Sequence, residues 1–176
     1  MKRALIIAFV VNLVVILLSY VLLPERVATH FGLGGAPDSW ASKEFNLLLI
    51  LVIEIPLFLA LVYAPTLTLK VPAKLVNLPH RDYWLRPENR ALTQAKVARH
   101  AHLFGTALYT FLTCVSVLVL HANLSQPVHL DEQAFLLLFG VFLAFVIYWC
   151  IEFIRAFRLP ANAATRPVQG SNETIA

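Results

Sequence analysis

Charged residues are scarce in this chain. Asp, Glu, Lys and Arg make up 14% of its 176 residues, and its mean hydropathy is +0.73. A soluble domain carries about 25% charged residues. The shortage excludes an ordinary soluble domain and suits burial in lipid, because a charge at the bilayer centre is costly. The sequence also has no Lys/Arg run interleaved with aromatic residues and no nucleic-acid-binding motif, so we expect no nucleic-acid partner.

Cysteine and the familiar catalytic motifs are also nearly absent. Cys114 and Cys150 are the two cysteines. They lie at different depths of apolar stretches, so we expect no disulfide and interpret both as buried small hydrophobes. The chain has no Ser/His/Asp motif, phosphate-binding loop or dinucleotide fingerprint. A metal site built from the histidines of the outer loops is an alternative, but their spacing matches no metal-binding motif. These histidines are His30, His121 and His129. We therefore expect no enzyme, no metal and no cofactor.

Long apolar stretches are what the sequence has instead. Each is close to the ~20 residues that cross about 30 Å of hydrocarbon as a helix. They predict an all-α, polytopic membrane protein with four transmembrane helices, forming a single domain over residues 1–160. The segment 161–176 is rich in Ala, Asn, Thr and Pro, which predicts a disordered tail. The four predicted spans are residues 4–23, 45–63, 103–120 and 134–154.

Basic residues are distributed unevenly between the polar segments. The N-terminus, the second loop and the C-terminal end hold 12 of the 14 Lys and Arg residues, and the first and third loops hold the other two. Cytoplasmic segments of membrane proteins carry the excess of positive charge. We therefore expect both termini and the second loop to be cytoplasmic. In that loop, Pro87 followed by Glu88 predicts a helix start, and we expect a helix that runs into the third span.

Polar residues inside the spans are the first candidates for function. Glu54 lies in the middle of the second span, and an ionisable residue there is a functional hypothesis by default. Asn12 lies at a comparable depth in the first span, and we expect it to be the hydrogen-bond partner of Glu54. The pair either holds two helices together through an interhelical hydrogen bond or forms part of a functional site. Gly140 and Ala144 of the fourth span predict a close helix contact.

The first polar loop, residues 23–43, is the most distinctive segment. Its glycines and the Pro37–Asp38 step are turn signals, which predict one ordered conformation rather than a flexible tether. Two compatible interpretations follow. The loop is a rigid cap folded onto the helices, or it is an outward binding surface. The ligand-binding residues that we predict on this surface are His30, Asp38, Trp40 and Lys43.

Two segments also resemble a known family. The first loop has Leu-Pro, then His and an aromatic residue, then Gly-x-Pro-Asp, an aromatic residue and Ser-Lys. This order and spacing resemble the bacterial membrane domain of unknown function at the N-terminus of SdpI-type immunity proteins, with Gly32 as a departure where the family usually has a polar residue. The second loop, NLPHRDYWLRPENR, resembles a segment of some relatives. The matching positions of the first loop are Leu23, Pro24, His30, Phe31, Gly35, Pro37, Asp38, Trp40, Ser42 and Lys43. Those singled out in the second are Asn77, Pro79, Asp82, Tyr83, Trp84 and Glu88.

The resemblance implies a multi-pass protein of the bacterial cytoplasmic membrane. SdpI protects a cell from a peptide toxin and relays the toxin's presence to a cytoplasmic repressor. By this resemblance we expect a non-enzymatic, ligand-sensing or toxin-immunity-like protein with an outward binding loop for a peptide or small ligand. A cytoplasmic regulator would contact the basic second loop. The alternative is a small proton-coupled transporter or intramembrane enzyme that uses Glu54. The ligand and the oligomeric state are left open.

Overall fold

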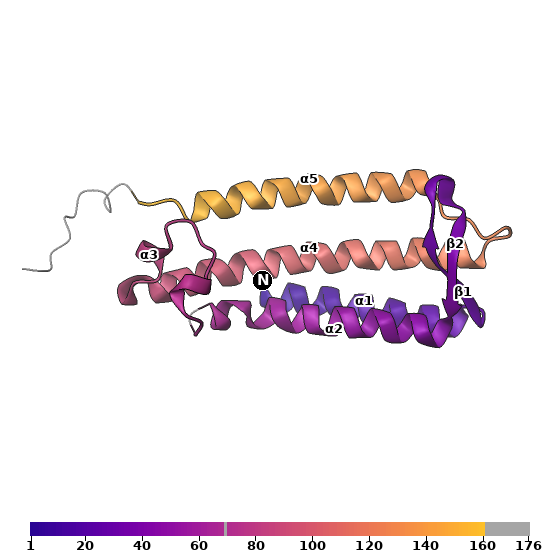
Figure 1. The fold of residues 1–176 in the computed structure, drawn as a ribbon, viewed down its shortest axis with the longest axis horizontal. Helices are drawn as coiled ribbons and strands as arrows, with labels where there is room; N and C mark the ends of the chain where they lie inside the picture. The colour runs from indigo at the N-terminus through magenta and orange to yellow at the C-terminus, as the bar shows by residue number, and fades with distance from the viewer. Residues whose placement is uncertain (69, 161–176) are drawn as a thin grey trace, which may run out of the picture.

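Four long helices lie side by side and give the molecule its elongated shape in the computed structural model (Figure 1). The structure describes residues 1–160 with the exception of residue 69, so the predicted tail lies outside the described residues. Each of the four is long and apolar enough to cross a membrane, which confirms the predicted multi-pass, mostly helical architecture. The four helices are α1 (Lys2–Leu22), α2 (Lys43–Leu67), α4 (Arg90–Leu124) and α5 (Glu132–Ala156).

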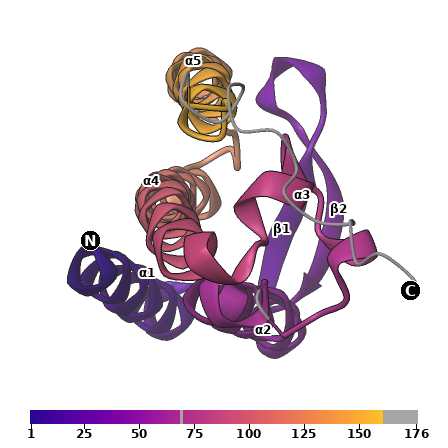
Figure 2. The ribbon, with the colours of Figure 1, turned by 90° about the vertical axis from the view of Figure 1, so that its left-hand side faces the viewer.

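Helix α4 is the centre of the bundle, because α1, α2 and α5 each pack against it. Figure 2 shows α1, α2 and α4 grouped together and α5 set apart beside α4. Gly105 of α4 permits the close approach, since a Cβ there would lie 2.7 Å from Leu5 Cδ1 and 3.0 Å from Leu61 Cδ1. The contact expected at Gly140 and Ala144 is wrong within this chain. Both are exposed, and nothing lies within 4 Å of a Cβ built on Gly140.

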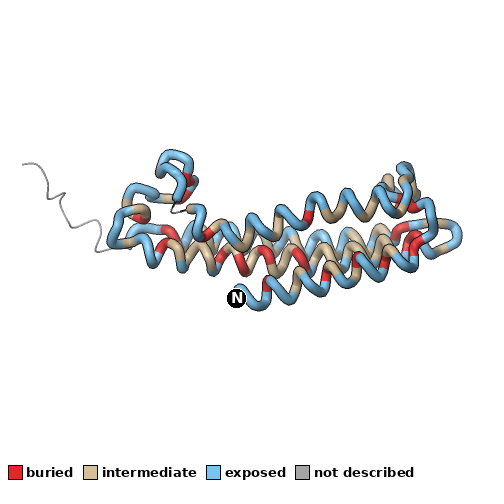
Figure 3. The backbone as a smooth tube through the Cα atoms, turned by 90° about the horizontal axis from the view of Figure 1, so that it is seen from below, coloured by how far each residue is buried: buried red, intermediate tan, exposed pale blue. Residues whose placement is uncertain are grey.

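Most of the apolar surface faces outward, as it does in a protein surrounded by lipid (Figure 3). Helix α5 has no buried residue at all, because it packs mainly on one neighbour. Cys114 and Cys150 are free, as expected, but the interpretation of both as buried is wrong because they lie on exposed helix faces. Contact with lipid costs an apolar side chain no free energy, so the hydrophobicity of a residue does not predict whether it is buried within this protein.

The first loop is a β-hairpin, which the all-α expectation did not include. Strands β1 (Arg26–Phe31) and β2 (Pro37–Ser42) pair antiparallel, and a short 3-10 turn, η1 (Leu33–Gly35), joins them. Gly34 and Gly35 have φ of 79° and 76°, a conformation that favours glycine. The hairpin crosses the ends of the helices from α2 towards α5 (Figure 1). We call this end of the molecule the hairpin end.

Two contacts fix the hairpin to the end of the bundle. The side chain of Asn123, in the last turn of α4, makes two hydrogen bonds with the backbone of Ala28. The Ala28 N–H donates to Asn123 Oδ1 at 2.7 Å, and Asn123 Nδ2 donates to the Ala28 carbonyl at 3.1 Å. The Leu130 N–H donates to the Gly35 carbonyl at 2.9 Å. A Cβ at Gly35 would lie 2.1 Å from the Leu130 carbonyl oxygen, so only glycine fits there. The first loop is therefore an ordered cap.

The opposite end of the bundle, the basic end, carries the second loop and the end of α5, and the N-terminus lies part of the way along the bundle (Figure 1). Residues 70–89 form short turns, η2 (Ala73–Leu75), α3 (Arg81–Trp84) and η3 (Pro87–Asn89), which we call the basic-end cap. From η3 the chain continues directly into α4, which confirms the helix start predicted near Pro87. Because the four long helices alternate in direction, α1 begins in the half of the bundle nearer this end and α5 ends there. That this end is cytoplasmic stays a prediction.

Candidate functional site

A buried layer of polar groups crosses the middle of the bundle. The Asn12 side-chain amide of α1 donates to Glu54 Oε2 of α2, so the structure brings together the two residues that the sequence singled out. Thr113 of α4 donates from Oγ1 to Asn12 Oδ1 at 3.3 Å. Asn12 is fully buried and Glu54 is 8% exposed. We call Asn12, Glu54 and Thr113 the polar layer, which joins the three packed helices.

Three aromatic rings close the bundle directly beneath the polar layer. Phe9 and Phe58 stack with ring centroids 4.0 Å apart, and Tyr109 meets their edges at 5.2 and 6.2 Å. Phe58 lies four residues after Glu54, one helical turn nearer the basic end. The Tyr109 hydroxyl donates to the backbone carbonyl of Glu54 at 2.7 Å and so ties the two layers together. This aromatic layer separates Glu54 from the basic end.

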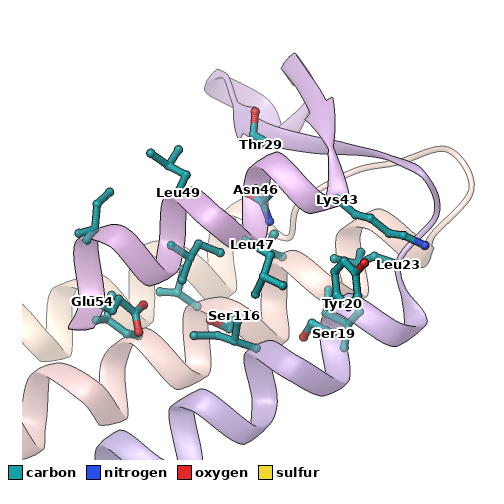
Figure 4. Close-up of a pocket in the computed structure, with 17 residues that line it drawn as sticks. Ser19, Tyr20, Leu23, Thr29, Lys43, Asn46, Leu47, Leu49, Glu54 and Ser116 are labelled. Atoms are coloured by element: carbon teal, nitrogen blue, oxygen red, sulfur yellow. The ribbon is translucent and has the colours of Figure 1, made fainter. Parts of the chain in front are cut away.

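On the other side of the polar layer the helices part and leave a cavity of about 310 Å³, the hairpin-end cavity (Figure 4). Lys43 and Tyr20 lie towards the hairpin end of the close-up and Glu54 at its inner end, with Ser116 between them. Asn46 lies eight residues before Glu54, so the cavity extends about 12 Å along α2. Its lining residues come from α1 (Ile16, Ser19, Tyr20), from Leu23 and Thr29, from α2 (Lys43, Asn46, Leu47, Leu49, Ile50, Ile53, Glu54) and from α4 (Leu112, Val115, Ser116, Val119, Leu120).

The chemistry of this cavity is mainly apolar with a few polar groups at its two ends. Lys43 lies towards the hairpin end, where its Nζ donates to Glu25 at 2.8 Å and lies 5.5 Å from the ring centre of Tyr20. At the inner end, the Asn12 amide donates a hydrogen bond to Glu54 Oε2, while Glu54 Oε1 has no hydrogen-bond partner among the described residues. An apolar cavity with a few convergent polar groups is the usual form of a small-ligand site.

The other predicted loop residues lie on the hairpin and make different contacts. His30 Nδ1 and Asp38 Oδ1 are 2.6 Å apart, and both side chains are largely exposed. The Trp40 ring lies beneath the Arg26 guanidinium, whose carbon is 6.0 Å from the ring centre. Of the four predicted binding residues only Lys43 lines the hairpin-end cavity. The single surface expected from the loop is therefore divided, because Lys43 is the first residue of α2 whereas the other three lie on the strands.

Several polar residues of the site were not predicted as site residues from the sequence. A signal was present, since Tyr109, Thr113 and Ser116 follow the i, i+4, i+7 spacing of one helix face. Asn12 and Ser19 are likewise seven residues apart in the first span. The structure shows that these faces meet, with Ser19 and Ser116 lining the cavity and Thr113 bound to Asn12. Polar periodicity within an apolar span thus marks the inner face.

The second-loop motif is largely structural. Trp84 is 2% exposed, donates from Nε1 to the Phe157 carbonyl at 2.8 Å and packs on the Phe157 ring at 5.6 Å. Trp84 therefore forms the core of the basic-end cap. Thr93 supports it by donating to the Trp84 carbonyl at 2.6 Å. Tyr83 and Pro79 are half-buried, whereas Asn77, Asp82 and Glu88 are exposed.

Metal-binding side chains do not gather in the part of the chain that the structure describes. No group of three or more His, Cys, Asp or Glu side chains among the described residues could hold a metal ion. The His30–Asp38 pair on the hairpin is two residues short of the four ligands of a structural zinc site. The expectation that the protein uses no metal stays a prediction.

Comparison with known proteins places the chain in a family. Residues 7–55 match the model described as "Domain of unknown function (DUF1648)". The matched segment contains α1 from residue 7, the hairpin and α2 as far as residue 55, and so both members of the Asn12–Glu54 pair. An uncharacterised protein of Archaeoglobus fulgidus is 33% identical over 138 residues, which cover 74% of this chain and 70% of that protein. No solved structure matches the chain. The chain therefore carries a DUF1648 domain at residues 7–55 and belongs to the same family as this archaeal protein.

Proposed function

We propose that this chain is a non-enzymatic, ligand-sensing membrane protein of the toxin-immunity type, whose ligand binds in the hairpin-end cavity. The observation that supports it most is the shape of that cavity. It lies beneath the hairpin, is lined mainly by apolar groups, and ends at Glu54 and the aromatic layer. A cavity that is closed at its inner end by an aromatic layer suits binding better than passage.

The cavity defines the class of ligand. Its walls suit an apolar body, such as an alkyl chain or the apolar side chain of a peptide. Glu54 Oε1, which has no partner among the described residues, suits a hydrogen-bond donor at the inner end of the ligand. Lys43 lies towards the hairpin end, next to Glu25. The ligand that fits best is therefore amphipathic, with a donor group that enters first.

The remaining parts of the proposal follow from the resemblance to SdpI-type immunity proteins. The protein lies in the bacterial cytoplasmic membrane with the hairpin outside. A peptide or small ligand arrives from outside, and a cytoplasmic regulator contacts the exposed residues of the basic-end cap, Asn77, Asp82 and Glu88.

Binding of a simple amphipathic probe tests this proposal. Decylamine should raise the thermal unfolding midpoint of the chain in lipid nanodiscs more than decanoate of the same length does, because the amine can donate to Glu54. Ser116→Trp fills the cavity and should abolish the difference. Val117→Trp at the neighbouring position, which is exposed to lipid, should retain it. Equal stabilisation of both variants would place the amine elsewhere and contradict the proposal.

One observation favours the alternative, a small proton-coupled transporter or an intramembrane enzyme that uses Glu54. The Glu54 carboxyl lines a cavity instead of being enclosed by protein, so water that fills this cavity would contact it. Ligand sensing tolerates Glu54→Gln, because the apolar walls of the cavity are unchanged, whereas proton handling does not. A Gln variant that binds decylamine but has lost a proton-dependent uptake activity would favour the transporter.

A further inference from the structure

A second cavity of about 310 Å³ lies at the basic end, between α4 and α5, and is separate from the hairpin-end cavity. Its residues come from the first half of α4 and the last turns of α5, close to the basic-end cap. We call it the arginine cavity, because an arginine from each helix lines it. Its lining residues are Arg99, His100, Leu103, Tyr148, Trp149, Glu152, Arg155 and Ala156.

Aromatic residues place the arginine cavity at the level of the lipid headgroups. Tyr148 is 58% exposed, and the neighbouring Trp149 donates from Nε1 to the His100 carbonyl at 3.0 Å. Amphipathic Trp and Tyr rings of membrane helices concentrate at the boundary between hydrocarbon and water. Leu103, one turn further into the span than Arg99, gives the cavity an apolar side that faces the hydrocarbon.

The charges of the cavity have a positive surplus. Arg155 binds Glu152 at 2.9 Å, so these two charges compensate each other. Arg99 forms no ion pair with any described residue. Lys96, one turn before it, donates to the carbonyl of Ala156 and adds a second cation beside the cavity. An exposed guanidinium is well shaped to bind two phosphate oxygens.

A buried group without a partner belongs to a residue in the wall of the same cavity. His100 is 8% exposed and lines the cavity, with its ring against Phe153 at 5.4 Å between centroids. Its Nδ1 has no hydrogen-bond partner among the described residues. Most buried polar atoms of proteins have one, so this ring nitrogen is an unsatisfied polar atom in the wall of a cationic cavity.

From these observations we propose that the arginine cavity binds the phosphate group of an anionic phospholipid, with Arg99 as its main contact. The phosphate lies at the headgroup level beside Arg99, and the acyl chains run past Leu103 along the exposed apolar faces of α4 and α5. Basic cavities between membrane helices bind such headgroups in the leaflet next to the positively charged loops. The bound lipid fastens α5, which otherwise packs mainly on α4, to the rest of the bundle.

Thermal unfolding of the full chain in a neutral detergent tests the site. Added phosphatidylglycerol should raise the midpoint, and phosphatidylcholine at the same concentration should not. Inorganic phosphate distinguishes the two sources of the phosphate group. If it stabilises the chain as well as phosphatidylglycerol does, the ligand is soluble phosphate and the lipid proposal is overturned.

Two substitutions with opposite expected effects make the test specific. Arg99→Gln should weaken the apparent affinity for phosphatidylglycerol about fivefold, the usual contribution of one basic residue near anionic lipid. Glu152→Gln should strengthen it, because it frees Arg155 from its ion pair. Arg90→Gln is the matched control, since Arg90 lies nine residues before Arg99 on the opposite face of α4 and does not line the cavity. Equal affinities for the Arg99→Gln and Arg90→Gln variants would overturn the proposal, as would weaker binding by the Glu152→Gln variant.

Discussion

Asn12 of α1 and Glu54 of α2 meet in the middle of the bundle, where the Asn12 amide donates to the Glu54 carboxyl. The pair lies between the hairpin-end cavity and the aromatic layer, and Thr113 adds the third helix. It therefore holds the helices together and forms the inner end of the candidate site. The two roles respond differently to substitution.

Glu54→Gln should leave the stability of the protein nearly unchanged, because the amide keeps the shape and an acceptor for Asn12. Glu54→Leu should lower the free energy of unfolding by about 1–3 kcal/mol, because it leaves the buried Asn12 donor unsatisfied. Thermal unfolding of both variants in nanodiscs compares the two. If Gln destabilises as much as Leu, the pair depends on the charge of the carboxylate and not on the hydrogen bond.

Gly35 and Gly34 offer a matched pair for the docking of the hairpin. Both have positive φ, so alanine at either position strains the backbone by about 1–2 kcal/mol. Only at Gly35 does a Cβ also collide with the Leu130 carbonyl, whereas nothing lies within 4 Å of one at Gly34. Gly35→Ala should therefore lower the unfolding midpoint more than Gly34→Ala and weaken hydrogen-exchange protection of the Leu130 N–H. Similar effects at the two positions would show that the contact with the third loop is unimportant.

Trp84 should be the most sensitive residue of the basic-end cap. Trp84→Ala removes the ring that packs on Phe157 and should lower the free energy of unfolding by about 3–5 kcal/mol. Trp84→Phe keeps much of the packing and loses the bond to the Phe157 carbonyl, so about 1 kcal/mol is expected. Limited proteolysis of residues 70–89 in both variants gives an independent measure. Rapid cleavage of the cap in wild type would contradict a docked cap.

Single cysteines test the orientation of the chain in the membrane. In a background with Cys114 and Cys150 replaced by alanine, Leu33→Cys places a thiol at the 98% exposed tip of the hairpin. Arg86→Cys places one in the exposed part of the basic-end cap. The excess of positive charge predicts that an impermeant maleimide added to intact cells labels the first and not the second. The reverse labelling would invert the topology and place the hairpin-end cavity on the cytoplasmic side.

Much of the bundle could be predicted from the sequence because the bilayer imposes a length and a composition on every span. The same constraint made Glu54 and Asn12 conspicuous, since a carboxyl and an amide inside lipid need partners. Their pairing required only that both lie at similar depth.

Long-range contacts of the loops could not be predicted in the same way. Asn123 binds Ala28 across 95 residues, and no local pattern announces that a strand will lie there. Trp84 shows a second limit, because an aromatic residue near a predicted boundary suits the lipid interface and a small protein core equally well. Gly140 shows a third limit, because a small residue on a span indicates that another helix can approach closely but does not identify that helix.

Water access to the hairpin-end cavity is the most direct test of its role as a binding site. In the cysteine-free background, Ser116→Cys places a thiol inside the cavity, and Val117→Cys places one at nearly the same depth on a lipid-facing side. Thiosulfonates react with the thiolate, which needs water to form. A charged thiosulfonate added from the hairpin side should modify the Ser116→Cys variant at least about tenfold faster than the Val117→Cys variant, and decylamine should slow the faster reaction. Equally slow modification of both variants, unaffected by decylamine, would show that the cavity is closed to water and contradict its role as a ligand site.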